Sequence, residues 1–249
     1  PEQSDLALER KLEEKYGLTE ALIAVPAYEQ SSDQEVAFQA VDYILRVLKK
    51  NMVFGMTWGR AMHEFVEQLA KDERLRSLSF QNVKVVPFLG TPGAIQSDSW
   101  NTTTYSNTLA TKVGNLLHCA SYNLSAPMYV EGTKEKELIE SIDEIAKVLH
   151  MAETADIALI GIGSMQDDSS IIKAEIRTKE EYKELVRKGA VGEIVGRIYD
   201  KNGQTVDEDL KRKMVGISLD KIAKIPVRVG MSYGKDKIEA MKGAIAGGL

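Results

Sequence analysis

Short apolar runs alternate with amphipathic helical patterns along most of this 249-residue chain. The run IALIG at residues 157–161 carries no polar side chain, which is typical of a central strand in a parallel sheet with both faces covered. Strands that alternate with helices at steady spacing predict a three-layer α/β domain with a mostly parallel sheet. The predicted strands are residues 21–28, 52–55, 83–89, 122–129, 157–161 and 227–231; the predicted helices are residues 4–16, 35–49, 106–117, 134–151, 179–188 and 236–246.

Segment 189–220 departs from this alternation and predicts a small inserted subregion. Its apolar runs are short, at residues 194–199 and 215–218, and Asp200-Lys201-Asn202-Gly203 is a hairpin-type turn. Elsewhere, Ser106 is expected to cap the helix that follows it, and the polar residues 97–105 predict neither helix nor strand.

Composition excludes several classes of protein. A net charge of −5 makes the chain a poor candidate for binding duplex DNA by itself. Its single cysteine, Cys119, excludes an intrachain disulfide, and no apolar run approaches the length of a membrane span. The N-terminus has no signal-peptide character, so a cytoplasmic location is expected. A start without Met fits either a piece of a longer protein or removal of the initiator.

Ligands of parallel sheets bind beyond the carboxyl ends of the strands. Four predicted strands run into glycine-rich loops there, and we expect these loops to converge on one crevice. The loop glycines are Gly55 and Gly59, Gly90 and Gly93, Gly161 and Gly163, and Gly234.

The segment from Phe54 to Met62 predicts a strand, a glycine turn and a helix N-terminus. Such a junction presents free backbone N–H groups and the positive end of a helix dipole, which suit a phosphate. Arg60 would add a charge-assisted donor. The segment matches neither a Walker loop nor a G-x-G-x-x-G fingerprint, so a turn without a ligand is the alternative.

Two further motifs carry charge among small residues. Glu193 could accept hydrogen bonds from sugar hydroxyls, and Arg197 could contact a carboxylate or a phosphate; the alternative is a solvated ion pair between the two. Lys237 stands with Gly234 where the last predicted helix begins. A cation there opposes the helix dipole, and an anionic ligand would remove the conflict.

The residue patterns expected for metal binding and for common hydrolytic sites are absent from the sequence. His63, His118 and His150 have no metal-ligand spacing, and neither a G-x-S-x-G nucleophile elbow nor a glycosidase carboxylate pair is present. We therefore expect no metal and no cofactor. Asp156, at the entry of a strand, is interpreted as structural.

Taken in order, these motifs resemble the C-terminal effector-binding domain of SorC-type bacterial transcriptional regulators, a family that includes deoxyribonucleoside and central glycolytic regulators. The resemblance spans nearly all of the chain from residue 20 on. The matching pieces are Thr57-Trp58-Gly59-Arg60-Ala61, Val85 to Gly90, Ser106-Asn107, Ala126-Pro127, Ala155 to Gly163, Gly189 to Glu193, Asp200 to Gly203, Val215 to Leu219, and Tyr233 to Met241.

The resemblance implies a Rossmann-like fold related to sugar-phosphate isomerases that binds a phosphorylated sugar without converting it. It implies a linker helix in residues 1–20, leading from an absent N-terminal helix-turn-helix DNA-binding domain, and an effector domain in residues 21–249. A homodimer or homotetramer is expected. The residues that match the ligand site of the family are Gly55, Thr57, Trp58, Gly59, Arg60, Ala61, Gly90, Thr91, Asn107, Gly161, Gly163, Glu193 and Lys237.

The chain departs from the family pattern at several of these positions. Arg60 and Ala61 stand where threonines are frequent in the family, so a guanidinium replaces hydroxyl donors. Leu89 stands where some members carry a basic residue, and its apolar side chain favours a monophosphate ligand over a bisphosphate. Tyr233 replaces a glycine and narrows the mouth of the crevice. Two other functions remain open: an aldose–ketose phosphate isomerase with Glu193 as general base, and a dimerisation module with a vestigial pocket.

Overall fold

A parallel five-stranded sheet forms the centre of the protein, which a computed structural model describes for residues 5–25, 32–92 and 102–249. Its strands are β1 (Val53–Met56), β2 (Lys84–Pro87), β3 (Ala120–Ser121), β4 (Ile157–Gly161) and β8 (Val227–Met231). The strand order is β3-β2-β1-β4-β8, and all four pairings are parallel. The predicted mostly parallel sheet is therefore confirmed.

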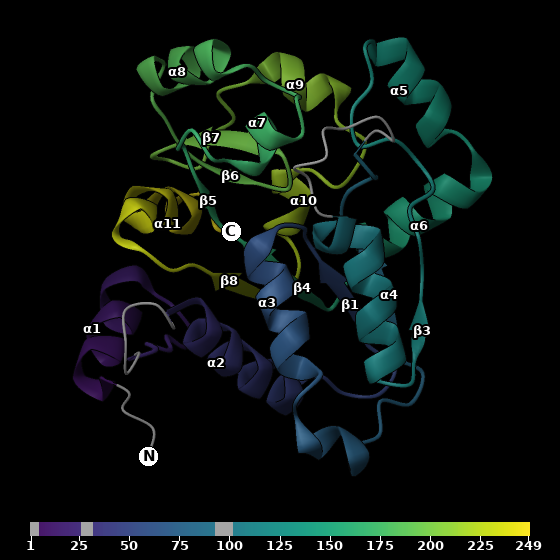
Figure 1. Cartoon of the computed structure of the whole chain (residues 1–249), viewed down its shortest axis with the longest axis vertical. Helices are drawn as coiled ribbons and strands as arrows, with labels where there is room; N and C mark the ends of the chain where they lie inside the picture. The colour runs from purple at the N-terminus through teal and green to yellow at the C-terminus, as the bar shows by residue number, and fades with distance from the viewer. Residues whose placement is uncertain (1–4, 26–31, 93–101) are drawn as a thin grey trace.

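Helices cover both faces of this sheet because its strands are apolar on both sides. Phe54 and Leu159 pack into one cluster with α2, α3 and α4, whereas Ala158 and Ile160 pack into a second cluster with α6 and α10 on the other side. Alternate residues of a strand point to opposite faces, so β4 contributes to both cores. Figure 1 shows α2, α3 and α4 lying over the sheet. The helices are α1 (Leu6–Tyr16), α2 (Ser32–Val47), α3 (Arg60–Leu69), α4 (Ser106–Leu116), α5 (Thr133–Glu140), α6 (Asp143–Glu153), α7 (Ser170–Lys173), α8 (Lys179–Arg187), α9 (Glu208–Lys213), α10 (Leu219–Ile222) and α11 (Ile238–Ala246), with 3₁₀ turns η2 (Glu73–Arg76), η3 (Thr102–Thr104) and η4 (Lys235–Lys237).

A second, antiparallel sheet is made of β5 (Gly163–Ser164), β6 (Ala190–Ile194) and β7 (Arg197–Asp200). β6 and β7 lie in the predicted subregion 189–220, and β5 joins them from outside it. The prediction of one strand over residues 194–199 is wrong. Val195 and Gly196 both have positive φ, 55° and 70°, and form the two-residue turn of a β-hairpin. The turn predicted at Asp200 is confirmed, because the Gly203 N–H donates to the Asp200 carbonyl at 2.9 Å.

Residues 21–25 are irregular, so the strand predicted over residues 21–28 is wrong for its described part; residues 26–28 lie outside the described residues. The N–H groups of Ala21 and Ile23 donate to the carboxylates of Glu13 and Glu9 on α1, at 2.9 and 2.8 Å. The apolar run therefore docks on α1 through its backbone instead of joining the sheet.

Two other predicted elements are interrupted. The strand predicted over residues 122–129 is reduced to isolated bridges at Pro127 and Tyr129. The helix predicted over residues 134–151 divides into α5 and α6, because the Ser141 N–H closes α5 on the Glu137 carbonyl and a new helix begins after Ile142. Likewise, residues 215–218 form no strand, and Gly216 forms an isolated bridge with Leu89 in the loop after β2.

The residues before α4 also differ from the prediction. Thr102–Thr104 form a short 3₁₀ turn, while residues 97–101 lie outside the described residues. Tyr105 is the N-cap residue of α4, and the buried Ser106 hydroxyl instead donates to the Leu89 carbonyl at 2.8 Å. Ser106 thus ties α4 to the loop after β2 and is not the cap.

Candidate functional site

The junction of β1 and α3 forms one wall of the candidate site. Gly59 is the N-cap residue of α3 with φ 100°, a conformation that glycine adopts without steric strain. Its N–H donates to the Thr104 carbonyl at 2.9 Å, which fixes the turn. Within the described ranges 5–25, 32–92 and 102–249, the N–H groups of Arg60 and Ala61 in the first turn have no acceptor. The predicted phosphate-type helix start is therefore present.

The buried Thr57 joins this wall to the next strand. Its hydroxyl oxygen accepts a hydrogen bond from the Gly161 N–H at 3.0 Å, and its own N–H donates to the Leu159 carbonyl at 3.2 Å. These bonds hold the carboxyl ends of β1 and β4 together. Thr57 thus has a structural role that its position in the motif did not reveal.

Glu193 lies almost fully buried on β6, with 6% of its surface exposed. One carboxylate oxygen accepts a short hydrogen bond from the Gly196 N–H. Burial raises the pKa of the Glu193 carboxyl, while the Gly196 bond, the Trp58 side chain and the charge of Lys237 oppose this shift. Glu193 is therefore a buried acid held next to the β1–α3 wall and a cation.

Gly163 provides the space for this carboxylate. It pairs with Glu193 across β5 and β6, and a Cβ at this position would lie 2.8 Å from the second carboxylate oxygen. Any larger residue at position 163 would displace Glu193. The Gly-x-Gly turn after β4 thus supports the acid directly.

Lys237 closes the opposite side of the site, at the last residue of η4. Burial lowers the pKa of its ammonium group; Arg60 also lowers it, while Asp236, Asp168 and Glu193 raise it. The Ser164 hydroxyl donates to the Asp236 carboxylate at 2.7 Å, and Gly163 beside it pairs with Glu193, so the segments that carry Lys237 and Glu193 lie side by side. Groups from the loops after β1, β4 and β8 and from the hairpin of β6 therefore meet at the carboxyl end of the sheet.

Arg60 does not stand free at the helix start. Its guanidinium forms an ion pair with Asp168 at 2.8 Å between Nη2 and Oδ2, and both side chains are more than half exposed. Asp168 lies between β5 and α7, in a segment that the sequence motifs did not single out.

Thr91 and Asn107 form a second polar group beside the first. The Asn107 amide donates to the Thr91 hydroxyl at 2.7 Å and to the Leu124 carbonyl at 3.0 Å. Asn107 also accepts from the Leu124 N–H at 2.9 Å. Its side-chain amide is thus largely engaged within the protein, whereas Thr91 remains partly exposed.

Two of the predicted ligand glycines face the protein. A Cβ at Gly55 would lie 1.9 Å from the Phe88 ring, and a Cβ at Gly90 would lie 2.6 Å from the carbonyl oxygens of Ala126 and Pro127. Close packing therefore accounts for both residues. Their contact with a ligand stays a prediction, as it does for the other matched positions.

Glu193 and Arg197 do not form the solvated ion pair that their spacing allows, because both side chains are buried. The Arg197 Nη2 donates to the carbonyls of Gly216 and Met214 at 3.1 and 3.3 Å, and burial lowers the pKa of the guanidinium to about 10. Within the described part of the chain its Nε and Nη1 have no hydrogen-bond partner. Arg197 thus fastens β7 to the segment that pairs with the loop after β2.

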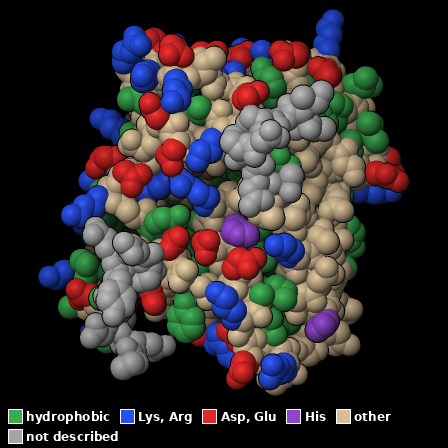
Figure 2. All heavy atoms as spheres, viewed as in Figure 1, with side chains coloured by type: hydrophobic (Ala, Val, Ile, Leu, Met, Phe, Trp, Pro, Cys, Tyr) green, Lys and Arg blue, Asp and Glu red, His purple; other side chains and the backbone are tan. Residues whose placement is uncertain are grey.

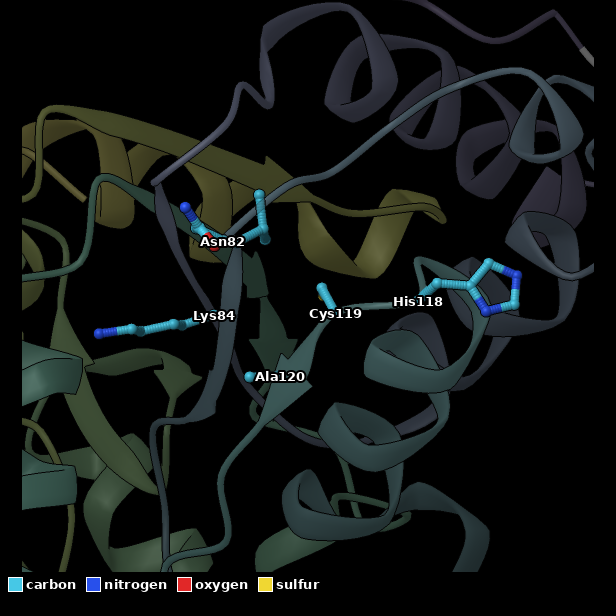
Figure 3. Close-up of a pocket in the computed structure, with 6 residues that line it drawn as sticks. Asn82, Lys84, His118, Cys119 and Ala120 are labelled. Atoms are coloured by element: carbon cyan, nitrogen blue, oxygen red, sulfur yellow. The ribbon is translucent and has the colours of Figure 1, made fainter.

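A separate hollow lies at the amino end of the sheet, with a volume of about 550 Å³. It is lined by Asn82, Val83, Lys84, His118, Cys119 and Ala120. Figure 3 shows the side chains of Lys84 and His118 pointing in opposite directions, so these polar groups do not converge on a common point.

Among residues 5–25, 32–92 and 102–249, no group of three or more metal-ligating side chains occurs, and no helix has the length and apolar character of a membrane span.

Comparison with known proteins agrees with this geometry. The profile of the sugar-binding domain family matches residues 1–249. The chain belongs to this sugar-binding domain family. The sorbitol operon regulator of Klebsiella pneumoniae is 28% identical over 247 residues, which cover 98% of this chain and 75% of the regulator.

Solved structures give the same result for the fold. The full-length crystal structure of that sorbitol operon regulator has a TM-score of 0.85 at 26% identity, covering 98% of this chain and 76% of that one. A DeoR family transcriptional regulator from Listeria monocytogenes has a TM-score of 0.84 at 26% identity, covering 98% and 92% of the two chains. The predicted resemblance to SorC-type regulators is confirmed, and the family supports a regulator effector domain over an isomerase.

Proposed function

We propose that this sugar-binding domain binds a phosphorylated sugar at the carboxyl end of its parallel sheet, without converting it, and reports the ligand to an upstream DNA-binding domain. The observation that carries the proposal is a convergence of complementary groups. The free N–H groups of the α3 start, the cations Arg60 and Lys237, and the buried acid Glu193 all meet at one edge of the sheet.

The phosphate would lie at the start of α3. Backbone N–H groups and the helix dipole favour an anion there, and Lys237 and Arg60 would add charge-assisted hydrogen bonds. A dianion next to Lys237 would also favour its charged form, which burial disfavours in the free protein. With Leu89 buried after β2 and no cation at that position, one phosphate is a better fit than two.

The sugar would be oriented by Glu193 and by the polar group at Thr91. An ionised carboxylate only accepts hydrogen bonds, so Glu193 selects hydroxyl donors. The Thr91 hydroxyl lies on the neighbouring loop and offers both a donor and an acceptor.

Ligand binding would reach DNA through the N-terminal side of the domain. Residues 1–20, including α1, would link this domain to a helix-turn-helix domain, and ligand-dependent packing of a homodimer or homotetramer would alter operator affinity in the cytoplasm. On the face in Figure 2, acidic and basic side chains are interspersed, which fits a domain that contacts DNA through another part of the protein.

A thermal-shift screen of the 249-residue chain against triose, pentose and hexose phosphates, with the matching free sugars as controls, tests this proposal. Ligand at about 100-fold excess over its Kd should add about 2.7 kcal/mol to the free energy of unfolding. A shift with a phosphosugar, absent with the free sugar, is the expected result. Turnover of the bound sugar would favour the isomerase instead, and no shift with any phosphate would favour a dimerisation module.

A further inference from the structure

We propose that Asp168 is an internal competitor of the ligand, whose carboxylate occupies Arg60 in the free protein and must leave when a phosphate binds. This inference rests on the proposed function, since it concerns the regulation of the same site. It assigns a role to a residue outside the sequence motifs. The consequence is a higher threshold for phosphate binding than Arg60 and Lys237 alone would give.

The ion pair occupies a donor that a phosphate at the start of α3 would also use. Arg60 is the first residue of α3, and its Nη2 lies 2.8 Å from the Asp168 Oδ2. Negative charge is favoured at this helix end whether a carboxylate or a phosphate supplies it. Asp168 and a ligand phosphate would therefore compete for the same donor, the guanidinium of Arg60.

The segment that carries Asp168 is anchored on both sides, which holds the carboxylate near Arg60. Before it, the buried Ser164 donates to the Asp236 carboxylate at 2.7 Å. After it, Ser169 caps α7 by accepting from the Ile172 N–H at 3.3 Å, and the fully buried Ile171 fixes α7 in the core. The ends are fixed, while the side chain of Asp168 remains exposed to solvent.

The pair is also suited to exchange. Both of its side chains are more than half exposed, 60% for Arg60 and 57% for Asp168, and ion pairs of this kind are weak in water. A phosphate would gain Lys237 and the helix N–H groups in addition to Arg60, whereas Asp168 has Arg60 as its one ion-pair partner among the described residues. The stronger anion can therefore displace the weaker one.

Titration of inorganic phosphate into the 249-residue chain, followed by ³¹P NMR, tests this competition. Asp168→Asn keeps the shape of the side chain and removes its charge. We expect about threefold to tenfold tighter phosphate binding, since the variant lacks both the competing ion pair and a like charge. Asp167→Asn is the matched control. It makes the same charge change one residue away, at an exposed residue that forms no ion pair within the described part of the chain, and should shift the Kd much less.

The contact between the two residues is isolated by a double-mutant cycle with Arg60→Ala. In that background Asp168→Asn should give a clearly smaller gain, because the donor for which the two anions compete is gone and only a like charge is removed. Unchanged binding by Asp168→Asn would overturn the proposal. Weaker binding would do so as well, and would make Asp168 a ligand contact. If neither the wild type nor Asp168→Asn binds phosphate, both the proposed function and the competition fail.

Discussion

The two ends of the parallel sheet differ in what they bring together. At the amino end a hollow of about 550 Å³ is lined by diverging polar side chains such as Lys84 and His118. At the carboxyl end, the exposed Arg60 forms an ion pair with Asp168, and the charges of Arg60 and the buried Glu193 both act on the partly buried Lys237. Convergence of charge, and not the size of a hollow, therefore distinguishes the candidate site.

The topology explains this difference. Parallel strands all end at the same edge of the sheet, and the helices that follow them begin near that edge. Helix N-termini carry free N–H groups and partial positive charge. The amino end instead receives the ends of helices, such as the segment after α4 that leads through His118 and Cys119 into β3.

The largest expected effect is on the Kd of the ligand, which should depend on the carboxyl end of the sheet and not on its amino end. Lys237→Ala should weaken phosphosugar binding roughly 10-fold to 100-fold, because a charge-assisted hydrogen bond contributes about 1.5–3 kcal/mol. Lys84→Ala at the amino end is the matched control and should leave the Kd unchanged. Calorimetric titration of both variants measures the difference. Equal losses in the two variants would break the comparison, since a general charge effect would then explain binding.

A second prediction separates packing from ligand contact at the carboxyl end. Gly55→Ala should lower the free energy of unfolding by about 2 kcal/mol, because the new Cβ would overlap the buried Phe88 ring. At Gly161 the nearest atoms to a Cβ lie 3.6 Å away, so Gly161→Ala should change stability by no more than about 0.5 kcal/mol. Urea denaturation compares the two variants. Similar stability losses would show that the loop glycines share one structural role.

The smallest effect concerns the amino end alone. Burial raises the pKa of the Cys119 thiol to about 11, so less thiolate is present in the folded protein than in the unfolded chain up to that pH. Maleimide should therefore react at pH 8 with the native chain at no more than about one tenth of its rate with the chain in urea. The native rate should rise as the pH approaches 11. Equal rates in both states would show that burial does not suppress the thiolate, and a faster native reaction would indicate an activated thiol.

The sequence predicted the central sheet well because β1 and β4 are apolar, β8 is apolar apart from Arg228, and all three lie between clear turn signals. It failed where tertiary contacts decide the backbone. Residues 21–25 are apolar, yet their N–H groups bind carboxylates on α1. The hairpin at Val195 was missed because a β-branched residue with positive φ is rare, so its sequence gave no turn signal.

The candidate site was predictable in part. The motif order located Arg60, Glu193 and Lys237, which the fold does bring close together. Asp168 carried no signal, because it lies 108 positions from Arg60 in the sequence and comes within reach of it only through folding. The burial of Arg197 was equally hidden, since spacing alone does not separate a solvated cation from one that binds carbonyls.

The hydrogen bonds of Arg197 connect two walls of the candidate site. Its guanidinium binds the carbonyls of Met214 and Gly216, and the same segment binds the loop after β2, through the Gly90 N–H to Val215 at 3.1 Å and the Ile217 N–H to Phe88 at 2.9 Å. These hydrogen bonds connect the hairpin that carries Glu193 to the loop that carries Thr91. We therefore expect the hairpin that carries Glu193 and the loop that carries Thr91 to move together when a ligand binds.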